Sequence, residues 1–196
     1  MGRTSDARDR LVTTTIELIQ ARGYAALGVA DICAAADVKK GSFYHFFASK
    51  QALTLEVLDV YWARQRENWL AVLRGDGSAL DRLQSLLTVQ SDAQCEAKAR
   101  TGVVNGCLIG NLALELSAQD HVVQAKLDDI FNEQISLVAL LLDDAAASGE
   151  IAASGRDLAR SVIAHLEGMV LFAKVTNDPG ILQPLFSQVK LLLGAA

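Results

Sequence analysis

The chain has 196 residues, of which 51% are hydrophobic and 21% charged. This length can bury a substantial core and fits one or two compact domains, so a disordered chain is excluded. The net charge of −5 at pH 7 argues against a protein that coats nucleic acid indiscriminately. No apolar run approaches the roughly 18 residues that cross a bilayer, and the charged first ten residues do not resemble a signal peptide. We therefore expect a cytoplasmic protein with no membrane partner.

The charges are distributed unevenly along the chain. Residues 1–50 carry seven Lys or Arg against five Asp or Glu, whereas residues 51–196 carry eleven against eighteen. A locally positive N-terminal part favours binding to a specific nucleic-acid site, although ordinary solvated surfaces also produce a difference of this size. The high apolar fraction for a charged chain indicates that a partner covers some apolar surface, and a homodimer is the simplest such partner.

The first predicted helix spans residues 10–22, and the side chains on its packed face are Leu11, Thr15, Leu18 and Ile19. Gly23 follows at the position where a glycine commonly ends a helix in a left-handed conformation. We expect this helix to pack on the pair of helices that follows.

Two short helices around a tight turn are predicted over residues 30–53, ADICAAADVKKGSFYHFFASKQAL. The turn falls at Asp37, because Asp is one of the few non-glycine residues that tolerate a left-handed backbone. The second helix runs from about Lys39 to Phe47 and has exposed hydrogen-bond donors in its first turn. This order suits a recognition helix, whose N-terminal residues meet base edges in the major groove of DNA. Ser49 is then the predicted N-cap of a third helix.

The motif GSFYHFFASKQAL, preceded by an I-x-x-A-A-x-V helix and a turn, resembles the DNA-binding domain of the TetR family of dimeric bacterial repressors. The resemblance is strongest over residues 11–58, and beyond them it rests on the helical pattern and the chain length. It implies a head that binds double-stranded operator DNA and a body that dimerises and binds a small-molecule or electrophile effector. Two features depart from the family pattern: Asp37 stands where glycine is usual, and Gly28-Val29 begins a helix where a capping Ser or Thr is usual.

Operator contacts are expected from the start of the recognition helix and from its neighbours. Tyr44 and Lys50 are expected to contact phosphates. Substitution of either residue would then lower the affinity for all DNA sequences alike. His45 is either a recognition-helix donor or a packing residue. The expected DNA-binding residues are Val29, Lys39, Lys40, Gly41, Ser42, Tyr44, His45 and Lys50.

Helical periodicity continues to the C-terminus without an alternating strand pattern. The expected helices span residues 49–73, 79–88, 101–117, 120–147, 158–175 and 179–193, with a break at residues 74–78 where Ser78 caps the next helix. Residues 91–100 are either a frayed helix end or a loop. The expected fold is therefore all-α with about nine helices: a helix-turn-helix DNA-binding head over residues 1–48 and a ligand-binding and dimerisation body over residues 49–196. The resemblance implies that the last two helices form a four-helix bundle with their mates, and Leu166 and Leu185 are expected in that seam.

A ligand pocket is predicted from the few polar and bulky aromatic residues in the apolar helices of the body. The segment 101–117 is almost wholly apolar, and its glycines at 102, 106 and 110 would leave one helix face bare for a ligand or for close helix packing. The candidate ligand or sensor residues are Trp62, Trp69, Asn105, Cys107, Asn111, Glu115, His165 and Lys174.

Among the three cysteines, Cys107 is the candidate sensor, because it lies at the start of a predicted helix whose amide dipoles favour a thiolate. Lys174 would lower the thiol pKa further if it lay nearby. The alternative is that Cys107 is a small residue where two helices cross. Cys33 is expected in the core, while Cys95 is reactive only through exposure, because its neighbour Glu96 disfavours a thiolate.

No catalytic, cofactor or metal motif is present: the three histidines lie far apart in sequence, and no pair has the spacing of a zinc site. We therefore expect no cofactor. Three functions remain. The first is a repressor released by a small molecule or an electrophile, the second is a redox-sensing regulator that acts through Cys107, and the third is a helical thiol-dependent enzyme, for which the sequence offers no base near the cysteine.

Overall fold

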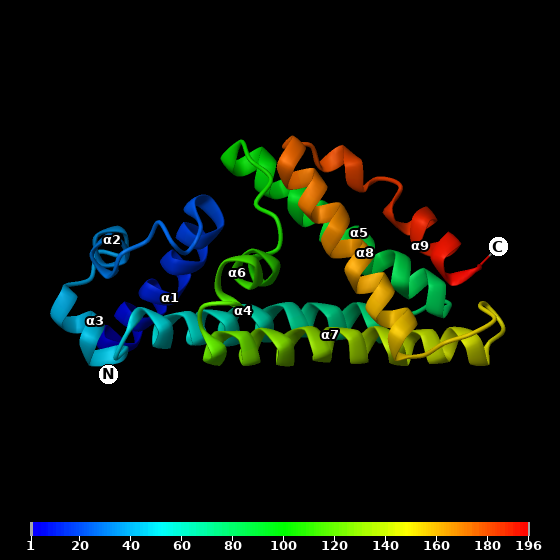
Figure 1. Ribbon diagram of the computed structural model, residues 1–196, viewed down its shortest axis with the longest axis horizontal. Coiled ribbons are helices and arrows are strands. Elements are labelled where there is room, and N and C mark those ends of the chain that lie inside the picture. Colours follow the sequence, from blue (N-terminus) through cyan, green and yellow to red (C-terminus); the bar gives the residue numbers. More distant parts are fainter. Residues whose placement is uncertain (1, 196) are drawn as a thin grey trace. The chain divides into compact units, whose positions relative to one another are not determined.

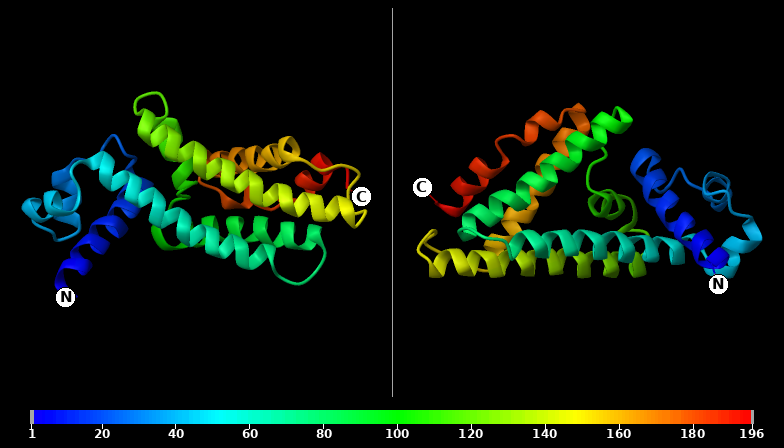
Figure 2. Two further views of the ribbon diagram at one scale, coloured as in Figure 1. Left: turned by 90° about the horizontal axis from the view of Figure 1, so that it is seen from below. Right: turned by 180° about the vertical axis from the view of Figure 1, so that it is seen from behind.

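A computed structural model describes residues 2–195 of the chain, with side chains from residue 6 onward. This part folds into nine α-helices and one 3-10 helix and contains no strand (Figure 1, Figure 2). The expected all-α fold is confirmed. None of the helices described is long and apolar enough to cross a membrane.

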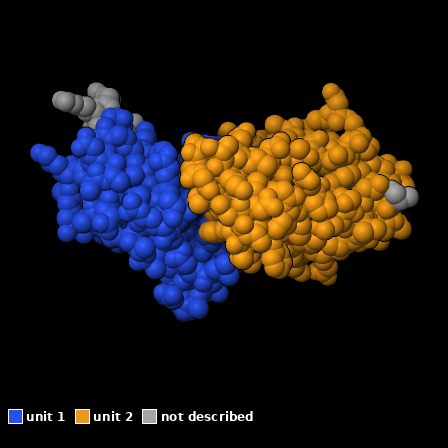
Figure 3. Space-filling view, turned by 90° about the horizontal axis from the view of Figure 1, so that it is seen from above, with its two compact units in different colours: residues 1–65, 108–128 blue, residues 66–107, 129–196 orange. Residues whose placement is uncertain are grey.

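The elements in chain order are α1 (Gly2–Arg22), α2 (Val29–Ala35), α3 (Lys40–Phe46), α4 (Lys50–Leu73), α5 (Ala79–Thr101), α6 (Leu108–Leu116), α7 (His121–Ala147), α8 (Arg156–Thr176), η1 (Pro179–Leu182) and α9 (Leu185–Leu193). They form two compact units (Figure 3). Unit 1 comprises residues 1–65 and 108–128, and unit 2 comprises residues 66–107 and 129–196. The expected division into a DNA-binding head and a body after residue 48 concerns function and stays a prediction, but α6 belongs to the same compact unit as the head.

Unit 1 is built around α1, which contacts α2, α3 and α6. Its core is apolar and includes the fully enclosed side chains of Leu11, Ile19, Ile32, Phe43 and Leu53. Helix α1 begins earlier than the predicted start at residue 10, and a salt bridge of 2.7 Å between Arg10 and Asp6, one turn apart, stabilises the added turn.

The turn between α2 and α3 has the left-handed residue that the sequence predicts: the φ angle of Asp37 is 51°. Arg10 of α1 donates hydrogen bonds to the carbonyls of Ala36 (3.2 Å) and Asp37 (3.3 Å), so the turn is tied to the first helix. At the start of α2, the Asp31 carboxylate accepts a hydrogen bond of 2.8 Å from the Gly28 N–H. Both departures from the family pattern are therefore accommodated by local contacts.

Unit 2 is a bundle in which η1 and α9 contact both α5 and α8. Ser78 caps α5, as predicted, by accepting a hydrogen bond of 3.2 Å from the Asp81 N–H. Residues 91–100, undecided from the sequence, are helical. The last predicted helix is divided into η1 and α9, with Pro184 at the N-cap of α9, because proline lacks the N–H that a continuous helix requires.

The single buried helix predicted over residues 101–117 is wrong. Helix α5 ends at Thr101, an irregular segment follows, and α6 begins only at Leu108. The φ angles of Gly102 and Gly106 are 81° and 75°, a left-handed conformation that glycine adopts without strain. Two of the three regularly spaced glycines therefore shape a loop, and the predicted bare helix face does not form.

The start of α5 is capped by the carboxylate of Glu150, which lies in the loop after α7. Glu150 accepts hydrogen bonds from the N–H groups of Ala79 (3.1 Å) and Leu80 (3.0 Å) and from the hydroxyl of Ser148 (2.7 Å). These contacts, led by that of Ser148, lower the pKa of Glu150 from 4.5 to about 2. The charged carboxylate is thus favoured by folding and also complements the positive end of the α5 dipole.

We expect Glu150→Gln to lower the melting temperature at neutral pH, because a lowered pKa contributes stability above the unfolded value of 4.5. This contribution is lost as the pH falls through the folded value of about 2. Thermal unfolding of wild type and variant should therefore converge between about pH 5 and about pH 2. Asp143→Asn, which removes an exposed carboxylate from α7, is the control. A constant difference over that range would show that the charge of Glu150 does not stabilise the fold.

Candidate functional site

Helix α3 presents a polar face to solvent and buries the opposite one. Phe43 is fully buried, whereas the side chain of Tyr44 is 52% exposed. We define the reading face as the exposed residues Lys39, Lys40, Gly41, Tyr44 and His45. Ser42 and Val29, two further predicted contacts, are half-buried beside it.

Aromatic packing fixes α3 in the head. The ring of Phe43 lies 5.2 Å from that of Tyr44, edge to face, and 5.9 Å from that of Phe47. The guanidinium of Arg8 lies 5.6 Å from the Phe47 ring and forms a salt bridge of 2.6 Å with Glu56 of α4. A helix of only two turns has little stability of its own, so these contacts determine its direction.

Lys50 makes internal contacts with the loop between α1 and α2. Its Nζ donates hydrogen bonds to the carbonyls of Tyr24 (3.0 Å) and Leu27 (2.6 Å) and lies 3.6 Å from the centre of the Tyr24 ring. Burial lowers the pKa of Lys50, while the charge of Glu115 acts in the opposite direction. Two of its three donors and one aromatic face are thus engaged inside unit 1, which favours a structural role for Lys50 over the predicted phosphate contact.

Glu115 of α6 also contacts the loop between α1 and α2, while its part in a ligand pocket stays a prediction. Its two carboxylate oxygens accept hydrogen bonds from the N–H groups of Tyr24 (3.0 Å) and Ala25 (2.9 Å). A Cβ atom at Gly23 would lie 3.0 Å from Glu115 Oε1, and the φ angle of Gly23 is 77°. Sequence reasoning missed this contact, because 91 residues separate Tyr24 from Glu115 and no local pattern connects them.

The irregular segment 102–107 is anchored within unit 2. Asn177, the left-handed C-cap of α8, accepts a hydrogen bond of 2.8 Å from the Val104 N–H and donates one of 3.1 Å to the Gly102 carbonyl. Farther along, the Gly106 N–H donates to Gln94 Oε1 at 3.0 Å. These contacts define the path of the segment up to Cys107.

The Cys107 thiol is half-buried and hydrogen-bonded to the carboxylate of Glu167, which comes from α8. Burial raises the pKa of Glu167, and the bond to the thiol opposes this shift in part. We call this pair the thiol–carboxylate centre. Lys174 lies on α8 two helical turns beyond Glu167 and is half-buried. Its proximity to Cys107, which the sequence left open, is the condition on which an effect on the thiol pKa depends.

The other candidate ligand residues are distributed over both compact units. Trp62 and Asn111 belong to unit 1, whereas Trp69 and Asn105 are buried in unit 2. His165 Nε2 lies 2.9 Å from Gln188 Oε1, a contact that ties α8 to α9. The participation of these side chains in ligand binding stays a prediction.

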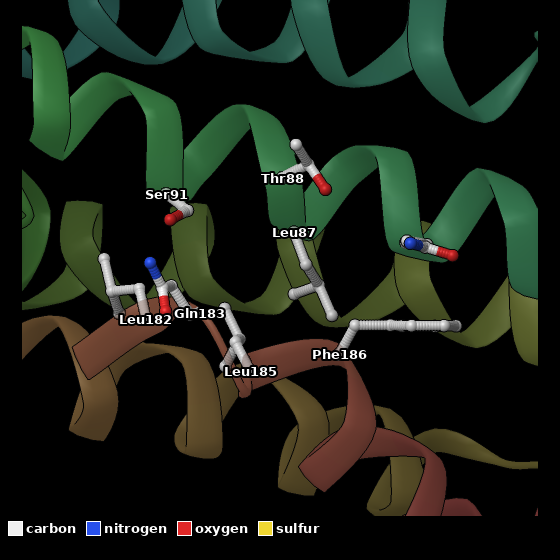
Figure 4. Close-up of a pocket in the computed structure, with 8 residues that line it drawn as sticks. Leu87, Thr88, Ser91, Leu182, Gln183, Leu185 and Phe186 are labelled. Atoms are coloured by element: carbon white, nitrogen blue, oxygen red, sulfur yellow. The ribbon is translucent and has the colours of Figure 1, made fainter. Parts of the chain in front are cut away.

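A cavity of about 190 Å³ lies in unit 2 between α5 and the η1–α9 segment (Figure 4). Leu87 of α5 faces Leu185 and Phe186 across it. The lining residues are Gln84, Leu87, Thr88, Ser91, Leu182, Gln183, Leu185 and Phe186, so none of the predicted ligand residues takes part. Among the residues that the structure describes, no three His, Cys, Asp or Glu side chains form a group that could hold a metal ion.

Comparison with known proteins decides the family. The profile of "Bacterial regulatory proteins, tetR family" matches residues 11–57, and that of "Tetracyclin repressor-like, C-terminal domain" matches residues 79–188. The chain belongs to the TetR family. It is 35% identical to the transcriptional regulator AcuR of Cereibacter sphaeroides over 178 residues, which cover 88% of this chain and 78% of AcuR.

Two further relatives agree with this TetR-family assignment along the chain. The repressor DhaR of a Mycobacterium species is 32% identical over 185 residues, which cover 91% of this chain and 87% of DhaR. The crystal structure of the reduced form of Escherichia coli NemR matches with a TM-score of 0.85 and 26% identity, covering 97% of this chain and 98% of that chain. TetR-family proteins are transcriptional regulators that bind operator DNA, so the alternative of a thiol-dependent enzyme is excluded.

We expect Lys39→Ala and Lys40→Ala each to weaken operator binding. Each should also reduce the slope of log affinity against log salt concentration by about one, the value for one lost phosphate contact. Lys50→Ala should lower the melting temperature and leave the salt slope unchanged, because its ammonium is bonded to backbone carbonyls. Arg74→Ala, at an exposed residue in the connector before α5, is the control for loss of one positive charge. Fluorescence anisotropy over a salt series measures the slopes. A reduced slope for Lys50→Ala would restore Lys50 as a phosphate contact.

Proposed function

We propose that this TetR-family regulator represses transcription as a homodimer and leaves its operator when an electrophile reacts with Cys107. The observation that carries the proposal is the thiol–carboxylate centre: a half-buried thiol is hydrogen-bonded to a carboxylate whose pKa is raised by burial. Glu167 thus supplies a proton acceptor in direct contact with the thiol, and a general base that removes the thiol proton as the sulfur reacts does not require a preformed thiolate.

The reaction with a soft electrophile such as a quinone or an enone needs no further component. The Cys107 sulfur forms a bond to the β-carbon of the electrophile, and the electron pair of the carbon–carbon double bond moves toward the carbonyl group. The thiol proton passes to Glu167 and from there to the adduct. A carboxylate with a raised pKa accepts this proton more readily than an ordinary one near neutral pH.

Support for a redox-responsive site also comes from NemR, whose crystal structure is that of a reduced form. That description concerns NemR. For the present chain it favours a second candidate, in which an oxidant rather than an electrophile modifies the same thiol. Oxidation to a sulfenic acid or a disulfide is reversed by reductant, whereas a thioether adduct is not.

DNA release distinguishes these signals. We expect N-ethylmaleimide to release wild type and Cys95→Ser from operator DNA at similar doses, whereas Cys107→Ser should stay bound. Glu167→Gln should react more slowly and lose most of the pH dependence near the pKa of Glu167, because a neutral amide cannot accept the proton. Recovery of DNA binding with dithiothreitol after peroxide treatment would identify the redox signal. If Cys107→Ser is released at the wild-type dose, Cys107 is a packing residue and a reversible ligand is the signal.

The homodimer is supported by large apolar side chains that are exposed on the last two helices, α8 and α9. Phe172 and Val175 of α8 are 60% and 73% exposed, and Leu191 of α9 is 80% exposed. Gly168 lies one turn before Phe172, and a Cβ atom there would meet nothing within 4 Å, so another helix could approach closely. Large exposed apolar surfaces mark contacts with partners. The expectation that Leu166 and Leu185 lie in the seam is wrong, since they are 4% and 2% exposed within one protomer.

Phe172→Asp and Val175→Asp should therefore give folded monomers with weakened affinity for a two-fold operator. Leu166→Glu should instead lower the unfolding temperature, because it places a charge in the core of one protomer. Sedimentation velocity and circular dichroism measure the two effects. Leu140→Asp on α7, where the side chain is 65% exposed, is the matched control. Dimers of unchanged strength in both α8 variants would place the interface elsewhere.

A further inference from the structure

The loop between α1 and α2 is held from both sides by side chains of opposite charge. Glu115 of α6 accepts hydrogen bonds from the N–H groups of Tyr24 and Ala25. Lys50 of α4 donates to the carbonyls of Tyr24 and Leu27. We call residues 23–28 the head loop. Its backbone N–H groups are bound by a carboxylate, and its backbone carbonyls are bound by an ammonium.

This arrangement determines the position of the loop more closely than apolar packing would. Each bond joins a charged group to a backbone group, and such bonds are shorter and stronger than neutral ones. The two oxygens of Glu115 meet two successive N–H groups, so the carboxylate sets an orientation as well as a distance. Gly23 leaves room for it, since a Cβ atom there would approach Glu115 Oε1 to 3.0 Å.

The head loop leads directly into the DNA-reading pair. Leu27 at its end is 4% exposed, and α2 begins two residues later. Helices α2 and α3 contact each other and α1, and each has only seven residues. Helices this short are held in place by their surroundings, so a displaced loop changes how α3 is presented.

Helix α6 connects this loop to the thiol–carboxylate centre along the chain. It begins at Leu108, the residue after Cys107, and Glu115 lies two turns later. Leu108 and Leu112 are fully buried, and the helix spans about 13 Å between the thiol–carboxylate centre and the head loop along the chain. Helix α4 supplies a fixed reference, because its Gln51 donates a hydrogen bond of 2.7 Å to Asp120 at the start of α7.

We propose that Glu115 is a positioning residue for operator binding: displacement of α6 shifts its carboxylate against the loop that Lys50 holds on α4, and the reading helix follows. The link between Glu115 and the head stands on the hydrogen bonds alone. Its trigger rests on the proposed function, in which modification of Cys107 displaces the start of α6.

The test uses the full-length protein with Glu115→Gln, Lys50→Met and the double variant. Asp128→Asn, which removes an exposed carboxylate from the same compact unit, is the control. We expect Glu115→Gln to weaken operator binding by about 5- to 150-fold, the usual range for coupled sites, with an unchanged salt slope. The double variant should lose less than the product of the single effects, because both side chains hold one loop. The proposal would be overturned if the loss of affinity in the double variant equalled the product of the two single losses. It would also be overturned if a folded Glu115→Gln variant bound the operator with wild-type affinity.

Measuring DNA release on alkylation separates the effect of Glu115 on the head loop from its proposed trigger, the modification of Cys107. In wild type, N-ethylmaleimide should lower operator affinity, and in Glu115→Gln the residual affinity should change little on alkylation. Glu115→Asp, which keeps the charge but shortens the reach, should recover part of the response. If Glu115→Gln is released as wild type is, Glu115 does not transmit the signal. If Cys107→Ser still responds while Glu115→Gln does not, the trigger lies elsewhere and the positioning role of Glu115 stands.

Discussion

The charged contacts on the head loop are the constraint on which the DNA-reading part of this protein depends. Glu115 holds the N–H side of the loop and Lys50 its carbonyl side, so three stretches far apart in sequence meet at one place. Neither side chain reads DNA in this account. They determine where the two short helices that do so are presented.

The same use of charge for internal contacts reduces the basic surface of the head. Residues 1–50 carry seven Lys or Arg, but Arg10 binds the turn after α2, Arg8 pairs with Glu56, and Lys50 holds the head loop. Lys39 and Lys40 stay exposed at the start of α3. A small number of exposed cations fits a protein that relies on the fit of its reading face, because each phosphate contact adds affinity without sequence information.

Local signals made much of the fold predictable. Asp37 in the turn, Ser78 before α5 and the glycine after α1 act through their own backbone or that of near neighbours, so sequence alone was sufficient. The glycine repeat led to a wrong prediction. The spacing of Gly102 and Gly106 suits one face of a helix, whereas both residues have left-handed backbones and lie outside a helix. Spacing alone does not distinguish a glycine that clears a helix face from one that turns the chain.

The candidate site was less predictable, because its pairs are distant in sequence. Cys107 was identified by its position, but its partner Glu167 lies 60 residues later and on another helix. Glu115 was assigned to a ligand pocket, since a carboxylate in an apolar helix predicts a partner without saying which. Lys50 follows the Ser49 cap as the family pattern requires, but only the fold shows that its ammonium reaches back to the head loop.

Hydrogen–deuterium exchange of the head loop tests the central claim most directly, which is that modification of Cys107 reaches the reading helices through Glu115. The amides of Tyr24 and Ala25 should be protected in the free protein, because both donate to the Glu115 carboxylate. Alkylation of Cys107 should accelerate their exchange in wild type, while the amides of α5 serve as an internal reference. Release of DNA on alkylation with unchanged protection at Tyr24 and Ala25 would contradict the account.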